Sequence, residues 1–218
     1  MIDIITLKVG QLQTNCYLVS DRESKDTIII DPGDDVDYII QTISSNSLTP
    51  RIILATHGHF DHIMAAWEIQ QIYKIPFWVN RLDLFLLDNM AKSANYFLKL
   101  KTGPPPIVSQ KLFDKKIFQF EKIKLTLLPS PGHTPGSFCF YLKSENILFS
   151  GDTIFAGGVV GRTDFSYSQK NDLKKSIEKI LILPRQTKIL PGHGIPSSIR
   201  KEITFKIPFR HIRWSLDQ

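Results

Sequence analysis

Cysteine is scarce in this sequence. The chain has only two cysteines, Cys16 and Cys139, and each lies inside an apolar stretch, NCYLV or SFCFYL. Thiols in such places are interpreted as small buried hydrophobic side chains. Two cysteines exclude a disulfide framework and a cysteine-based metal motif, and they fit a reducing compartment. We therefore expect a cytoplasmic protein.

Targeting and membrane-spanning patterns are also missing. The N-terminus, MIDIITLKVG, carries Asp3 and lacks the apolar core and cleavage signature of a signal peptide. No apolar run approaches the roughly 20 residues of a membrane span. With 42% apolar and 22% charged residues, the composition is ordinary for a soluble globular protein, and we expect no membrane partner. We expect residues 1–218 to form one domain, with a short basic tail from about residue 197.

The formal net charge is +6. A positive balance fits an anionic substrate or a nucleic acid, but lysine-rich solvated faces are its commoner cause. The charge is spread along the chain rather than gathered in one segment. Nucleic acid is therefore the less favoured partner.

Apolar runs bounded by Gly and Pro predict a mixed α/β fold. Strands are predicted over residues 2–8, 15–19, 27–30, 51–55, 76–79, 117–120, 123–128, 138–142, 147–149 and 187–190. Helical spacing is found over residues 34–45, 63–73, 81–101 and 169–182, and in part of the tail. Several strands followed by a helix occur twice, and two such halves back to back would form two central sheets with helices outside.

The segment THGHFDH, residues 56–62, lies between a predicted buried strand and a predicted helix. Gly58 lets the backbone bend between two histidines. His57 and His59, two residues apart, can point toward one ion, while Asp61 and His62 can turn toward a second point nearby. Histidine and aspartate at this spacing indicate a metal site rather than a chance cluster of polar loop residues.

Three further candidate ligands follow apolar strands and have glycine beside them: His133, Asp152 and His193. Considered alone, His133 would be interpreted as an ordinary turn histidine and Asp152 as a strand-capping aspartate. Strand ends on one edge of a sandwich can converge, however, and would bring these side chains together. One ion would then have His57, His59 and His133. The second would have Asp61, His62 and His193, and the two oxygens of Asp152 could serve both.

Mixed nitrogen and oxygen ligands suit a catalytic zinc site better than a closed structural one. Iron or manganese can occupy similar ligands, so the metal's identity stays open. Asp31, at the end of another predicted strand, is a candidate acceptor for a ligand imidazole. A simple turn aspartate before Pro32 is an equally good interpretation.

Five motifs in this order resemble the metallo-β-lactamase superfamily: THGHFDH, PGHTPGS, SGDT, GRTDF and LPGHG. The nearer resemblance is to its glyoxalase II-like branch, the hydroxyacylglutathione hydrolases and their short bacterial relatives. It covers nearly the whole chain. It implies an αββα four-layer sandwich with a two-metal site at one edge. By resemblance, the seven ligands are His57, His59, Asp61, His62, His133, Asp152 and His193.

The resemblance also implies a reaction. Two divalent ions, most readily zinc, lower the pKa of a bridging water, and the resulting hydroxide attacks the carbonyl carbon of a thioester or related acyl substrate. Asp61 would hold its ion and orient the hydroxide or pass on a proton. Arg162 and Asp164 of the GRTDF motif are expected to form a salt bridge that shapes the loop near the metals.

The chain departs from full-length glyoxalase II enzymes at its C-terminus, where they have an added helical domain that supplies basic residues to glutathione. The missing domain puts glutathione specificity in doubt. The basic tail is better explained as a segment that covers the sandwich or forms a homodimer contact than as a substrate-binding segment. A mononuclear-iron persulfide dioxygenase is the first alternative, although Pro135 and the PGHG motif favour the hydrolase. A nucleic-acid-processing metallohydrolase is the second, and a purely structural metal protein is less favoured still.

Overall fold

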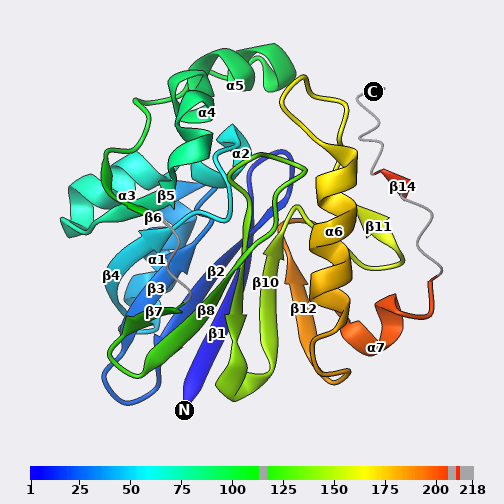
Figure 1. Cartoon of the computed structure of the whole chain (residues 1–218). Coiled ribbons are helices and arrows are strands. Elements are labelled where there is room, and N and C mark those ends of the chain that lie inside the picture. The colour runs from blue at the N-terminus through cyan, green and yellow to red at the C-terminus, as the bar shows by residue number, and fades with distance from the viewer. Residues whose placement is uncertain (113–116, 206–209, 212–218) are drawn as a thin grey trace.

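The computed structural model describes residues 1–112, 117–205 and 210–211. Two six-stranded sheets form its inner layers and helices lie outside each of them (Figure 1). A separate two-stranded parallel sheet pairs β11 (Val159–Val160) with β14 (Arg210–His211). The structure thus confirms the expected αββα sandwich.

The first sheet has the order β1-β2-β3-β4-β5-β6. Its first three strands pair antiparallel, and the pairs from β3 to β6 are parallel. The strands are β1 (Ile2–Val9), β2 (Thr14–Asp21), β3 (Asp26–Ile30), β4 (Thr49–Leu54), β5 (Phe77–Asn80) and β6 (Val108–Leu112).

The second sheet has the order β13-β12-β10-β9-β8-β7. Within it only β10 and β12 pair in parallel. The strands are β7 (Ile117–Phe120), β8 (Ile123–Pro129), β9 (Phe138–Leu142), β10 (Ile147–Gly151), β12 (Lys188–Pro191) and β13 (Ser197–Ser198).

The helices that cover the first sheet come from the first half of the chain, and α6 covers the second sheet (Figure 1). The α-helices are α1 (Val36–Ser45), α2 (Phe60–Ile63), α3 (Ala66–Tyr73), α4 (Leu84–Asp88), α5 (Met90–Leu98), α6 (Lys170–Leu181) and α7 (Ile199–Glu202). Short 3₁₀ turns are η1 (Arg81–Asp83) and η2 (Lys143–Glu145). Within the described ranges, we find no helix with the length and apolar character needed to cross a bilayer.

Side-chain alternation along the strands divides the core into three layers. On β2, Cys16 and Leu18 pack toward the helices α1, α3 and α5, whereas Tyr17 and Val19 pack between the two sheets. The layer between the sheets is rich in aromatic rings, including Phe140. A third layer joins the second sheet to α6. Since both faces of each sheet are covered, the central strands are apolar on both faces.

Strand ends from both sheets meet at one edge. The backbone N–H of Phe138, where β9 begins, donates to the carbonyl of Thr56, just after β4, at 2.8 Å. Gly151, at the end of β10, has φ +48°, and a Cβ there would lie 2.5 Å from the Thr56 hydroxyl oxygen. Glycine is therefore needed where the end of β10 meets the turn after β4.

The structure differs from the predicted elements in the segment between β5 and β7. The helix expected over residues 81–101 is divided into η1, α4 and α5, and Asn89 lies between the last two. Its amide donates back to the Phe85 carbonyl at 2.8 Å, so a polar side chain binds the backbone where the helix breaks. Strand β6 was not expected, because VSQKL has no run of apolar residues and its pairing with β5 comes from the sheet.

Core packing between the sheets gives a stability prediction. Phe140 is fully buried there, so Phe140→Ala should lower the free energy of unfolding by about 3–5 kcal/mol. Tyr96→Ala is the matched control, because Tyr96 is 73% exposed and its loss should cost less than about 0.5 kcal/mol. Urea unfolding of both variants measures the difference. Equal losses would contradict this description of the core.

Candidate metal centre

The histidine segment begins where β4 ends, and Asp31 fixes its first residue. Asp31 Oδ1 accepts the Thr56 backbone N–H at 2.7 Å, and Oδ2 accepts the Thr56 hydroxyl at 2.7 Å. Both residues are buried. The carboxylate at the end of β3 therefore holds the turn after β4, its parallel neighbour.

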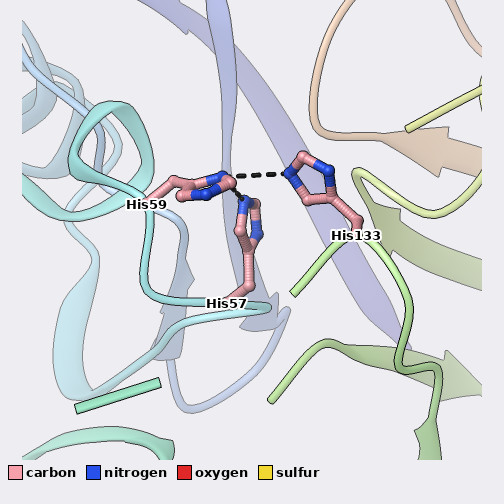
Figure 2. A group of neighbouring side chains, drawn as sticks. All are labelled: His57, His59 and His133. Carbon is pink, nitrogen blue, oxygen red and sulfur yellow. Dashed lines mark hydrogen bonds between the residues drawn. The ribbon is translucent and has the colours of Figure 1, made fainter. Parts of the chain in front are cut away.

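One group of three imidazoles converges at this edge (Figure 2). His57 Nε2 lies 3.0 Å from His59 Nδ1, and His133 Nε2 lies 2.9 Å from the same atom. His57 and His59 come from the first half of the sandwich and His133 from the loop after β8. We call these three residues the first group.

A second group combines Asp61, His62 and His193. His62 Nε2 lies 3.2 Å from His193 Nε2, and His193 Nε2 lies 3.2 Å from Asp61 Oδ2. His193 follows β12 and faces the two residues of α2. The groups are adjacent, since the rings of His57 and His62 have centroids 4.2 Å apart.

Asp152, just after β10, lies between the two groups. One oxygen, Oδ1, is 3.5 Å from His62 Nε2, and the other, Oδ2, is 3.6 Å from His133 Nε2 and 3.7 Å from His193 Nε2. Oδ1 is buried and has no hydrogen-bond partner. A buried carboxylate oxygen without a donor is costly unless a cation neutralises it.

The outer nitrogens of three imidazoles face groups that can only accept a hydrogen bond. His62 Nδ1 lies 3.1 Å from Asp31 Oδ2, His133 Nδ1 lies 2.9 Å from the Arg162 carbonyl, and His193 Nδ1 lies 3.1 Å from the Leu12 carbonyl. Each outer nitrogen must therefore carry the hydrogen, which leaves the inward Nε2 of the neutral ring with a lone pair.

The same holds for His57. Its Nδ1 lies 3.1 Å from the Thr56 hydroxyl oxygen, and that hydroxyl already donates its hydrogen to Asp31. Thr56 must accept from Nδ1–H, so the inward Nε2 of His57 also has a lone pair. Lone pairs that face one another repel unless a cation lies between them. Ligand nitrogens around zinc at about 2.0–2.1 Å lie roughly 3.3 Å apart, close to the nitrogen separations of both groups.

Burial keeps the first group neutral. It lowers the pKa of His57 well below its ordinary value, lowers that of His59 to about 3, and lowers that of His133. Metal ligation requires the neutral imidazole. At neutral pH these three rings are therefore in the form that binds a cation.

The second group and Asp152 place ionised carboxylates beside two imidazoles. Burial would raise the pKa of Asp61, but the neighbouring His62 and His193 outweigh it and lower the pKa to about 2. Asp152 follows the same pattern, and its pKa is well below the ordinary value. Burial would lower the pKa of His62 and His193, yet Asp152 and Asp61 raise both. Ionised carboxylates therefore attract positive charge to this side of the site.

The GRTDF motif has two contacts with its surroundings. Arg162 forms a two-pronged salt bridge with Asp164, with nitrogen–oxygen distances of 2.7 and 2.6 Å. Its guanidinium also lies 4.4 Å from the centre of the Phe165 ring. The side chain of Asp164 is exposed, and the Arg162 carbonyl lies 2.9 Å from His133 Nδ1, so this salt bridge shapes the loop that holds His133.

A small cavity opens above the two groups. Its volume is about 70 Å³, and its walls outside the candidate ligands are Leu12, Phe60, Phe97, Arg162 and Phe165. A larger groove of about 650 Å³ shares Leu12 and His193 with this cavity and is lined mainly by apolar residues. A small polar centre beside apolar walls is typical of a site for an organic substrate.

Sequence reasoning missed Tyr167. Its hydroxyl lies 2.8 Å from His59 Nε2, the nitrogen that faces away from the first group. The ring stacks on Phe165 and contacts Phe85 edge to face. The residue is 108 positions from His59 and belongs to no recognisable motif, so the sequence carried no signal for this contact.

Tyr167→Phe should weaken one bound ion. The substitution keeps the ring packing and removes the hydroxyl that is hydrogen-bonded to His59 Nε2, and loss of such an outer partner typically costs about 10–100-fold in metal affinity. Competition with a chromophoric chelator measures zinc affinity. Tyr96→Phe, at a position 73% exposed, is the control. Equal affinities in the two variants would refute a role for the Tyr167 hydroxyl.

Comparison with known proteins agrees with this geometry. A hydroxyacylglutathione hydrolase, GloC, from Haemophilus influenzae is 34% identical over 207 residues, covering 92% of this chain and 94% of that protein. The BLEG-1 B3 metallo-beta-lactamase superposes with a TM-score of 0.88 at 31% identity, covering 94% of this chain and 98% of the other. TTHA1623, solved in a di-iron-bound form, gives a TM-score of 0.83 at 32% identity, with 91% and 96% covered.

The family match spans most of the chain. Residues 9–193 match the family described as the metallo-beta-lactamase superfamily, a range that includes all seven candidate ligands. The seven side chains meet at one edge of the sandwich as two adjacent groups suited to divalent cations. The chain belongs to the metallo-beta-lactamase superfamily.

Proposed function

We propose that this protein hydrolyses a thioester or a related acyl substrate at a centre that holds two divalent metal ions. The observation that carries the proposal is the pair of adjacent ligand groups with inward-facing lone pairs, joined by Asp152. The hydrolase from Haemophilus influenzae, similar over nearly its whole length, supports the substrate class.

The seven side chains divide between two ions in this proposal. The first group, His57, His59 and His133, would hold one ion, and the second group would hold the other. Asp152 would contact both. When bound, the ions supply a nucleophile derived from water and a Lewis acid that polarises the carbonyl. Zinc suits these ligands, and iron is the main competitor, given the di-iron form of TTHA1623.

Asp61 is our candidate for orienting the attacking water. Its side chain is 12% exposed, lies on the cavity and has a pKa lowered to about 2. Such a carboxylate stays ionised at neutral pH and accepts a hydrogen bond from water, which turns an oxygen lone pair toward the substrate carbonyl. In hydrolysis the new carbon–oxygen bond replaces the carbon–sulfur bond. A thiol with a pKa of about 8.5 leaves readily as thiolate, so no strong acid is needed.

Neither cysteine fits the role of nucleophile. Cys16 and Cys139 are both fully buried, away from the cavity walls. Burial raises the pKa of the Cys139 thiol to about 11 and raises that of Cys16 further. Both thiols therefore stay neutral, and activated water is the better nucleophile.

The second ligand group argues against the dioxygenase alternative. A persulfide dioxygenase would need one iron on two histidines and an aspartate, whereas His62, His193 and Asp61 here form a further complete group within 3.7 Å of one another. Nucleic-acid processing has no comparable support from the site.

Loss of a ligand should remove both metal and turnover. His59→Ala and Asp152→Ala should each lower bound metal and reduce activity by more than the roughly 10–100-fold expected for an outer partner. Lys175→Ala, on the exposed face of α6 with a side chain 70% exposed, should change neither. Metal analysis and thioester hydrolysis test all three. Full activity in either ligand variant would rule out the assigned centre.

A substrate panel tests the reaction class. S-acyl glutathiones and other thioesters should release free thiol, detected with a chromogenic thiol reagent, with two metal ions per chain. Glutathione persulfide should give no oxygen uptake. The opposite pattern, oxygen uptake with one iron per chain and no thioester hydrolysis, would overturn the proposal in favour of the dioxygenase.

A further inference from the structure

We propose that Asp83 is a positioning residue that sets the spacing of the first metal-ligand group by joining its two loops. Asp83 ends η1, between β5 and α4, outside every motif that marks the ligands. It is fully buried. Asp83 is not one of the seven candidate ligands and has no part in the proposed reaction. Its hydrogen bonds to two loops therefore need another explanation.

Three donors converge on the Asp83 carboxylate. Oδ2 accepts the Gly58 backbone N–H at 3.0 Å and the Thr134 hydroxyl at 2.7 Å, while Oδ1 accepts the Gly136 backbone N–H at 2.7 Å. Burial raises the pKa of Asp83 to about 6, and these donors favour the ionised form. The carboxylate is thus satisfied entirely by two loops.

Those loops carry the whole first group. Gly58 stands between His57 and His59, and Thr134 directly follows His133. The first loop extends from β4 of one sheet and the second from β8 of the other. The distance from His133 to the other two imidazoles therefore depends on how the two halves are joined, and Asp83 bonds both halves beside the ligands.

Close packing leaves little freedom at this junction. A Cβ on Gly136 would lie 2.5 Å from the Asp83 carboxyl carbon, and a Cβ on Gly58 would lie 2.9 Å from the Asp83 carbonyl oxygen. Both loop positions are therefore restricted to glycine by Asp83. A shorter or displaced side chain at residue 83 would leave two peptide N–H groups without an acceptor.

The second group has other supports. His62 is held by Asp31, and His193 by the Leu12 carbonyl. The three hydrogen bonds of the Asp83 carboxylate go to Gly58, Thr134 and Gly136, and none of these residues is next to His62 or His193. Asp83 should therefore affect one of the two ions more than the other.

Asp83→Asn is the sharpest test, because it keeps the shape and removes one acceptor. Gly58 and Gly136 donate to different oxygens, so the amide NH₂ must face one of these N–H groups whichever way it is turned. Glu202→Gln is the matched control. Glu202 is also fully buried and accepts backbone N–H groups from Gly157 and Gly158, but it flanks no candidate ligand.

Zinc affinity of the full-length variants is measured by chelator competition, together with the visible spectrum of the cobalt-substituted proteins and the melting temperature without metal. Asp83→Asn should weaken one ion by roughly 10–100-fold and shift the cobalt spectrum, leaving the other ion within about threefold. Glu202→Gln should lower the melting temperature and leave both affinities unchanged. Should Asp83→Asn not fold, Thr134→Val, which removes one donor, should give a smaller loss in the same direction.

Wild-type affinities and spectrum in Asp83→Asn, or an equal loss for both ions, would overturn the positioning role. If only Thr134→Val folds, unchanged metal affinities in that variant would also overturn the positioning role. A wild-type protein that binds no zinc, cobalt or iron would instead refute the centre and the proposed function. The two failures are thus distinguishable.

Discussion

The structure of the site depends on imidazole nitrogens whose lone pairs are turned toward one another. Carbonyls, Asp31 and the Thr56 hydroxyl accept the hydrogens of the outer nitrogens of four rings, so the inner nitrogens of these rings carry no hydrogen when the rings are neutral. Such an arrangement is unfavourable in a buried place unless cations fill it. Two adjacent groups with this property, and one carboxylate between them, are what a two-metal hydrolase requires.

The sandwich makes this arrangement by bringing strand ends from both sheets to one edge. Outer partners then fix each ring. Asp31 is hydrogen-bonded to His62 directly and to His57 through the Thr56 hydroxyl. We propose that Asp83 sets the distance between the ligand-bearing loops of the two sheets. Two buried carboxylates outside the ligand set, Asp31 and in our proposal Asp83, therefore hold the candidate ligands in place.

Sequence reasoning was strongest where chemistry is concentrated in short segments. His57 to His62 lie in one turn, and His133, Asp152 and His193 each follow an apolar strand beside glycine, so their convergence could be predicted once they were considered together with the histidine turn and the family resemblance. Asp31 was a candidate for the same reason, and the structure places its carboxylate against His62. The four layers followed from strand and helix order.

Contacts between distant loops could not be predicted. Tyr167 meets His59, and Asp83 meets Gly58, Thr134 and Gly136, through bonds that only the finished fold creates. Strand β6 depends on pairing with β5 rather than on apolar residues of its own. The helix breaks at Asn89, whose side-chain amide binds the Phe85 carbonyl, and helical spacing does not reveal that bond.

A crystal structure of the metal-loaded protein, with anomalous diffraction recorded at the zinc edge, tests the central claim most directly. Two peaks are expected, one among His57, His59 and His133 and one among Asp61, His62 and His193, with Asp152 between them. A single peak, or none with waters bridging the imidazoles, would contradict it.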